Sequence, residues 1–190
     1  MSLKNKFREK YQNFRRLLYS VKRSFGLHRR DEKIWKTLID LHKSAGYHFG
    51  VFENERYIET IFTNDNNESI KFHFRIEADN LVYSALILPE FDVDRTNDIL
   101  VLSAHFNSLL TFGMVRVDLK NNYVELVHKE SLVSYHFFSG EIMNDLRRHY
   151  NVANDCLWAY NEMITSGEDP VFIMSELLRR IEKENDTTNA

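Results

Sequence analysis

Residues 96–130 read TNDILVLSAHFNSLLTFGMVRVDLKNNYVELVHKE, and this stretch predicts a helix that leads into a β-hairpin. Its first half, up to Leu110, carries apolar side chains around most of a helical circumference. We therefore expect this helix to pack on a sheet and to offer apolar surface to a further element. Gly113 permits a sharp exit from the helix. The second half alternates apolar and polar residues on both sides of an asparagine-rich turn at residues 120–123, which is typical of two antiparallel strands.

The chain before residue 96 predicts one helix followed by several strands. Residues 32–45 have apolar side chains at helical spacing and end beside Gly46, and we expect His42 at the surface or edge of this helix. The clearest strand is at residues 70–77, where apolar and polar side chains alternate, which predicts one buried and one solvated face. Residues 81–88 are apolar on both sides, which predicts a central strand. Further strands are predicted at residues 57–62 and, as an optional short first strand, at residues 47–52.

The chain after the hairpin predicts two helices and a polar tail. A long helical stretch begins near Ser139 and ends at Gly167, and Pro170 occupies the first position of a final short helix. The order α-β-β-β(-β)-α-β-β-α-α predicts an α+β fold in which helices pack on an antiparallel sheet. We expect a basic amphipathic helical arm at residues 1–30, an α+β domain at residues 31–183 and a disordered tail at residues 184–190.

The composition restricts the class of protein. The chain has 190 residues, of which 43% are hydrophobic and 13% aromatic, and this is enough for a packed core. No apolar run approaches the roughly 20 residues of a membrane span. Charges interrupt the apolar residues near the N-terminus, so no secretory signal is expected. Cys156 is the only cysteine, which excludes an internal disulfide and is typical of a reducing compartment, so we expect a cytoplasmic protein.

Residues 1–30 differ sharply in charge from the rest of the chain. They contain ten Lys or Arg and one Glu, which gives +9, and because the whole chain carries −3, residues 31–190 carry −12. Apolar residues recur at helical spacing from Leu3 to Phe25, which predicts an amphipathic helix at residues 3–25. The cations that could contact an anionic surface are Lys4, Arg8, Arg15, Arg16, Lys22, Arg23, Arg29 and Arg30.

Three surfaces could receive the apolar stripe of this helix. The first is the domain itself or a second copy of the chain, and the second is an anionic membrane surface. The third is nucleic acid, which is disfavoured because the acidic body would repel phosphate groups.

The sequence shows no reactive constellation. No two histidines have the i, i+4 spacing of a helical zinc site, and Cys156 has no second cysteine beside it. His149 and Cys156 could share one side of a helix, but an inert, buried thiol is the expected state. The acidic residues between Glu90 and Asp94 lack the glycine and the distal glutamate of a calcium loop. We therefore expect no enzyme, no cofactor and no metal site.

The residues from HFNSLL (105–110) through FGMVRVD (112–118) and the following hairpin resemble the YbjN-like family, bacterial proteins described as sensory-transduction regulators. Asn107, Gly113, Gly167 and the closing segment at residues 161–170 carry the resemblance, and residues 1–30 lie outside it. The resemblance implies a fold similar to that of type III secretion chaperones, with a helix, three strands, a helix, two strands and a helix. It also implies a dimer, and it implies no catalytic residue.

These observations lead to one expected function and one alternative. We expect a non-enzymatic protein-interaction module, chaperone-like or regulatory, that forms a homodimer and binds a segment of a partner protein. The alternative is a peripheral membrane-surface protein that is anchored by the basic amphipathic helix at residues 3–25.

Overall fold

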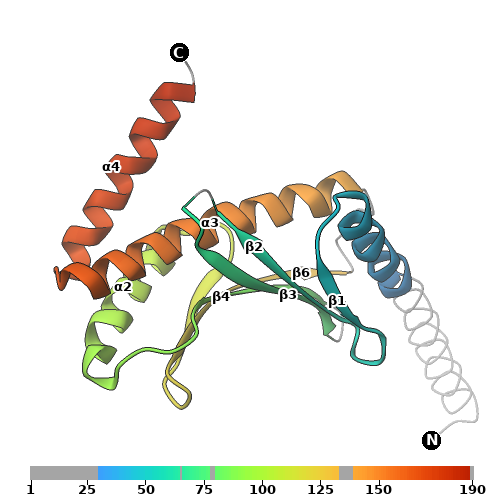
Figure 1. Cartoon of the computed structure of the whole chain (residues 1–190), viewed down its shortest axis with the longest axis horizontal. Helices are drawn as coiled ribbons and strands as arrows, with labels where there is room; N and C mark the ends of the chain where they lie inside the picture. Colours follow the sequence, from blue (N-terminus) through green and yellow to red (C-terminus); the bar gives the residue numbers. More distant parts are fainter. Residues whose placement is uncertain (1–29, 65, 78–79, 133–138, 189–190) are drawn as a thin grey trace, which may run out of the picture.

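The computed structural model describes residues 30–64, 66–77, 80–132 and 139–188, which form a six-stranded antiparallel sheet with helices packed around it (Figure 1). The strand order is β1-β2-β3-β4-β6-β5. The strands are β1 (Phe49–Phe52), β2 (Tyr57–Thr63), β3 (Ser69–Glu77), β4 (Asn80–Leu88), β5 (Met114–Asp118) and β6 (Tyr123–Ser131). The helices span residues 30–44, Thr96–Leu109 (α2), Ser139–Ser166 (α3) and Pro170–Thr188 (α4), and short 3-10 helices lie at Glu53–Glu55 and Val93–Arg95.

The predicted α+β fold and the predicted order of elements are confirmed, and the optional first strand is present as β1. The final helix is longer than expected, because α4 has 19 residues and includes most of the segment that the sequence assigns to the tail. Gly167, with a φ of +73°, separates α3 from α4, as the sequence predicts. The predicted arm helix at residues 3–25 lies outside the described residues.

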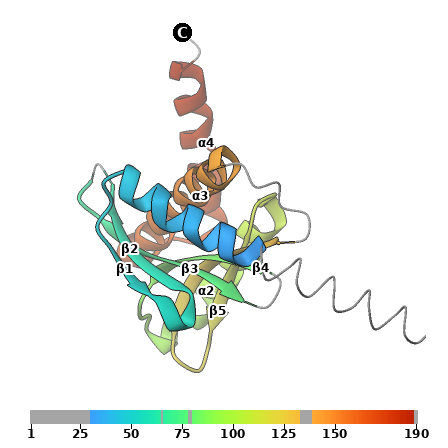
Figure 2. The ribbon, with the colours of Figure 1, turned by 90° about the vertical axis from the view of Figure 1, so that its right-hand side faces the viewer.

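Among the described residues, helices cover one face of the sheet and leave the other face open. Figures 1 and 2 show α3 and the helix at residues 30–44 on the same side of the sheet. The alternation of β3 turns Ile70, Phe72 and Phe74 toward these helices, and all three side chains are buried. Charged and polar residues alternate with them and face away from the helices. The strict period of two is thus the direct cause of the two-faced sheet.

Strand β4 is the centre of the sheet, as its continuous apolar sequence predicts. It pairs with β3 on one side and with β6 on the other. Leu81, Tyr83 and Ala85 are fully buried on the helix-covered face. Val82 is also buried, although it points to the open face, because the register places the long side chains of Arg75 and Lys129 on either side of it.

Helix α2 is joined to the edge of the sheet by one side chain. The Asn107 side-chain amide donates to the Val115 carbonyl oxygen at 3.0 Å and accepts from the Val115 N–H at 2.7 Å. These two bonds satisfy backbone groups on the outer edge of β5 that would otherwise be open for pairing with another strand. The asparagine that the YbjN-like resemblance singles out therefore has a structural role here.

Helix α2 packs on the sheet and on further helices, as the sequence predicts, but part of its apolar surface stays exposed. Leu100 and Val101 are 40% and 44% exposed. The reason is that α3 already covers the sheet face, so that α2 packs beside the sheet on β5, α3 and α4 (Figure 1). Its buried side is fixed to α3 by the Ser103 and Tyr160 hydroxyl groups, which lie 2.6 Å apart.

The expectation that His42 lies at a surface or edge is wrong. This side chain is fully buried, because the helix at residues 30–44 turns it toward the sheet. Its ring centroid lies 5.0 Å from that of Phe74 and 5.1 Å from that of Phe49. Its Nδ1 is 2.7 Å from the carbonyl oxygen of Leu38. Burial lowers the pKa of His42, which favours the neutral ring despite this hydrogen bond.

A second histidine, His149 of α3, is buried in the same aromatic layer. Its ring lies 5.7 Å from that of Phe72 and 5.9 Å from that of Tyr83, measured between centroids. Burial, with a smaller contribution from the neighbouring His128, lowers the pKa of His149 to about 3. The layer therefore accommodates a neutral imidazole and strongly disfavours an imidazolium ion.

Replacement of Asn107 should loosen the edge strand β5. We expect Asn107→Ala to lower the free energy of unfolding by about 1–2 kcal/mol, since two hydrogen bonds to backbone groups are lost. Asn97→Ala, at an exposed position of the same helix, is the matched control and should change it by less than about 0.5 kcal/mol. Urea unfolding followed by circular dichroism measures both, and equal effects of the two substitutions would contradict the assigned role.

The buried histidines should make the fold sensitive to acid. Because the pKa of His149 falls from its ordinary value of 6.5 to about 3 on folding, the unfolded chain binds more protons than the folded chain between these values. The contribution of His149 to the free energy of unfolding is fully present above pH 6.5. It is lost as the pH falls, at up to about 1.4 kcal/mol per pH unit.

We expect His149→Phe to reduce the slope of the unfolding free energy against pH between pH 6.5 and 5. Leu146→Ala, a core substitution in the same helix that removes no titrating group, should lower stability at every pH and leave the slope unchanged. Chemical unfolding at a series of pH values provides the measurement. An unchanged slope in His149→Phe would show that this histidine does not control the acid response.

Candidate functional site

The open face of the sheet contains a hollow that spans four strands. Its volume is about 340 Å³. The strand register places His73 of β3 opposite Ser84 of β4, and Arg116 of β5 opposite Glu125 of β6. The lining residues are His73, Arg75, Ser84, Leu86, Pro89, Arg116, Tyr123 and Glu125. The hollow therefore combines apolar side chains with both signs of charge.

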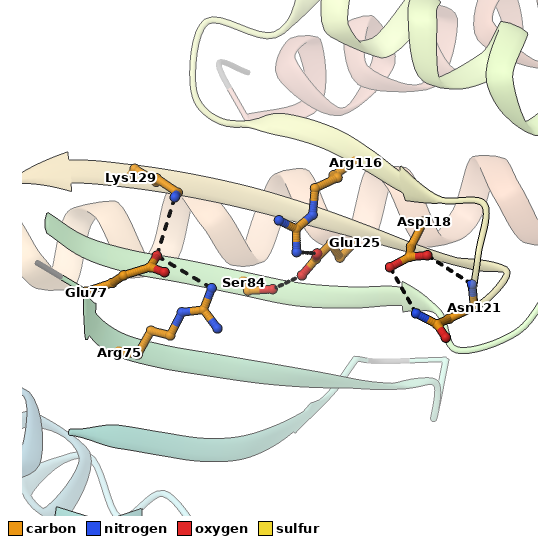
Figure 3. Close-up of polar contacts among 8 residues, drawn as sticks. All are labelled: Arg75, Glu77, Ser84, Arg116, Asp118, Asn121, Glu125 and Lys129. Carbon is orange, nitrogen blue, oxygen red and sulfur yellow. Dashed lines mark hydrogen bonds and ion pairs between the residues drawn. The ribbon is translucent and has the colours of Figure 1, made fainter. Parts of the chain in front are cut away.

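Glu125 is the buried charged group at the base of this hollow. The residue is only 7% exposed. Its Oε2 accepts a hydrogen bond of 2.5 Å from the Ser84 hydroxyl, and its Oε1 forms an ion pair with the guanidinium of Arg116 (Figure 3). Partial burial by itself would lower the pKa of Arg116, but the Glu125 carboxylate outweighs it, so the pKa of Arg116 is raised. These contacts offset the cost of burying the carboxylate.

Further ion pairs surround the hollow on the same face. The Lys71 ammonium lies 3.5 Å from the Glu59 carboxylate. The Glu77 carboxylate is shared by Lys129 at 3.4 Å and Arg75 at 3.6 Å (Figure 3). These side chains are about half exposed, so each pair contributes little to stability. Their main effect is to distribute charge of both signs across the face.

The hollow contains a serine, a histidine and a glutamate, the residue types of a hydrolytic triad. Their hydrogen bonds do not have the arrangement that such a triad needs. Ser84 donates its hydrogen bond to Glu125, whereas a nucleophilic serine would donate to a histidine. The Nε2 of His73 lies 3.4 Å from the Glu59 carboxylate. Burial lowers the pKa of His73, and Glu59 offsets this only in part. In this arrangement Ser84 supports a buried carboxylate.

The structure also places other residues that the sequence analysis considered. Cys156 is fully buried in α3, and burial raises the pKa of its thiol. Asp92 accepts a hydrogen bond from the backbone N–H of Asp94, so the acidic loop organises the start of the 3-10 helix before α2. Within the described ranges, no group of three or more His, Cys, Asp or Glu could hold a metal ion. The described helices include none with the length and apolar character to cross a membrane.

The cations proposed for an anionic surface fall almost entirely outside the described residues. Arg30 begins the first described helix. The other members of that set are Lys4, Arg8, Arg15, Arg16, Lys22, Arg23 and Arg29, and the structure does not test them.

Sequence reasoning found one side of the hollow and missed the rest. The alternation of β3 identifies a solvated face that includes His73 and Arg75. Glu125 and Arg116 come from the hairpin, and nothing in the sequence shows that β6 pairs with β4. The available signal was a glutamate within the apolar run of β6, since a charge in a buried strand usually has a partner.

Comparisons with known proteins agree with this architecture, in which helices cover one face of an antiparallel sheet. No family model matches the chain, and no curated protein matches it. A solved structure of similar fold is the crystal structure of YbjN from E. coli, with a TM-score of 0.52 and 13% sequence identity over 68% of this chain and 92% of that chain. The fold that the resemblance to the YbjN-like family implies is therefore confirmed.

Two further structures are similar at lower scores. One is the HopA1–SchA chaperone–effector complex, with a TM-score of 0.49 and 12% identity over 67% of this chain and 94% of that chain. The other is the ExsC–ExsE complex, with a TM-score of 0.46 and 11% identity over 66% of this chain and 92% of that chain.

Loss of the Ser84 hydroxyl should destabilise the buried carboxylate. We expect Ser84→Ala to lower the free energy of unfolding by about 1.5–3 kcal/mol, because a hydrogen bond to a charged group is lost. Ser69→Ala, at the exposed start of β3, is the control and should cost less than about 0.5 kcal/mol. Urea unfolding tests both substitutions. If Ser84→Ala were neutral, the hydrogen bond to Glu125 would not stabilise the fold.

Proposed function

We propose that this protein is a non-enzymatic interaction module, chaperone-like or regulatory, that binds a segment of a partner protein on the open face of its sheet. The observation that supports this most directly is the uncovered face with its hollow, in which apolar side chains lie among charged groups of both signs. Concave surfaces that combine apolar area with a few fixed polar groups are typical binding sites. An extended segment could lie across the strands and place alternate side chains in the hollow.

The proposal extends to the organisation of the chain. Residues 31–183 would form the interaction domain, which would act in the cytoplasm as a homodimer. The exposed Leu100 and Val101 of α2 favour a dimer, because neighbouring apolar side chains at a surface commonly mark an interface. Residues 1–30 would be a separate arm.

Peripheral membrane binding through residues 3–25 is the second candidate function. The contrast between +9 in residues 1–30 and −12 in residues 31–190 favours it, because a basic amphipathic helix is attracted to anionic lipid. In this case the open face of the sheet would have no partner. The two functions therefore predict different contacts for the same face.

Site-specific photo-crosslinking in living cells tests the proposed function. A photoreactive amino acid at the position of His73 lies on the open face, and the same amino acid at the exposed Arg147 of α3 lies on the covered side. We expect a discrete crosslink to another protein at position 73 and none at position 147. Crosslinks at both positions, or at neither, would contradict an interaction module on this face. Flotation with anionic vesicles that is lost at high salt, combined with no crosslink, would favour the membrane function.

A further inference from the structure

The net charge of the hollow differs in sign from that of the body around it. Residues 31–190 carry −12, yet Arg75 and Arg116 line the hollow against the single carboxylate of Glu125, which gives +1. Around the hollow, Lys71 faces Glu59 and Lys129 faces Glu77. Asp118 lies on the same face of β5, and its carboxylate accepts hydrogen bonds from backbone N–H groups of the turn that follows it. A locally positive hollow in an acidic domain is therefore a feature of the site itself.

The two guanidinium groups enter the hollow from opposite sides. Arg75 belongs to β3 and Arg116 to β5, and β4 and β6 lie between them (Figure 3). The register places Arg116 level with Lys71, and Arg75 lies four residues further along β3. With strands about 4.8 Å apart and a rise of about 3.3 Å per residue, the Cα atoms of Arg75 and Arg116 are separated by roughly 20 Å. Both side chains nevertheless line the same hollow, so each can extend toward a ligand between them. Both side chains are about half exposed, at 44% and 50%.

Each guanidinium retains capacity for a ligand. A guanidinium carries five N–H donors in a fixed fork, and it suits the two oxygens of a carboxylate. Arg116 directs one nitrogen to Glu125 and also interacts with the Tyr123 hydroxyl, and further N–H donors of its fork remain. Arg75 lies 3.6 Å from Glu77, which is beyond ordinary hydrogen-bond distance, and Glu77 also faces Lys129.

Glu125 limits the charge of the ligand. It is buried, accepts a hydrogen bond from Ser84 and pairs with the guanidinium of Arg116, so its carboxylate contributes a negative charge to the hollow. A doubly charged phosphate would meet this carboxylate at short range, whereas a single carboxylate would neutralise the hollow. Leu86 and Pro89 add apolar walls, which suit the methylene groups of a glutamate or aspartate side chain.

The open face around the hollow also indicates which side chains would lie next to the acidic side chain of the ligand. Phe52 of β1, Ile61 of β2 and Met114 of β5 project from the same face and are 49%, 57% and 56% exposed. An extended segment that places an acidic side chain in the hollow would lay nearby side chains over these residues.

We propose that the hollow recognises an acidic side chain, flanked by apolar residues, in an extended segment of the partner protein. Arg75 and Arg116 bind its carboxylate, and Glu125 excludes groups of higher negative charge. The inference rests on the proposed function, because it names the chemistry of the segment that the open face would bind.

Selection from a random library of 12-residue peptides tests this inference with the full chain as target. We expect the wild-type protein to enrich peptides with Asp or Glu next to apolar residues, and Arg75→Gln to lose the acidic preference. Arg75 is the preferred site of substitution because it does not pair with the buried Glu125. Arg116→Lys, which keeps the charge but not the fork, provides a second variant and should weaken the preference.

The basic arm needs its own control, because residues 1–30 could also select acidic peptides. The double substitution Arg15→Gln and Arg16→Gln changes none of the residues that line the hollow, and it should retain the preference. For the most enriched peptide, fluorescence polarisation should show about a tenfold loss of affinity when its acidic residue becomes an amide, and the same loss with Arg75→Gln.

The outcomes separate the two proposals. Enriched peptides without an acidic preference would overturn the inference and leave the proposed function standing. An acidic preference that survives Arg75→Gln but disappears in the arm variant would also overturn it, since the arm would be the source. Enrichment of no peptide would overturn the inference together with peptide binding by the open face.

Discussion

The helix-covered face of the sheet is the constraint on which the rest of the structure depends. Six antiparallel strands bury one row of side chains under α3 and the helix at residues 30–44, and Phe72, Phe74 and Tyr83 form the centre of this layer. Because burial removes water from the imidazole rings, the pKa values of His42 and His149 are lowered and the neutral rings are favoured within this layer. The same layer fixes the strand register and so determines which side chains point to the open face.

The open face follows from this register, and it accommodates a buried carboxylate within the sheet. Glu125 alternates with apolar residues along β6, and it is tolerated because Ser84 and Arg116 contact both of its oxygens. The hollow above it combines an apolar wall with guanidinium groups from two separate strands. Such an arrangement suits recognition of an extended chain, since it offers both area and a fixed charge.

Individual residues show how far sequence reasoning could go. The period of two in β3 correctly predicted both a buried and a solvated row, because alternation is a property of the strand itself. Asn107 was identified through resemblance, but its bonds to Val115 could not be inferred, because they depend on where α2 meets β5. The expectation that His42 lies at a surface or edge is wrong, because the sequence of a single helix does not show which of its faces a later strand will cover.

The sequence by itself determined the α+β class, the order of the elements, the central position of β4 and the glycine between α3 and α4. These depend on local periodicity and on backbone conformation, which neighbouring residues control. Only the tertiary structure decided that β6 lies between β4 and β5, that α2 packs beside the sheet, and that Arg75, Ser84, Arg116 and Glu125 share one hollow. These features arise from pairing between distant segments, which is set by the burial of a common core.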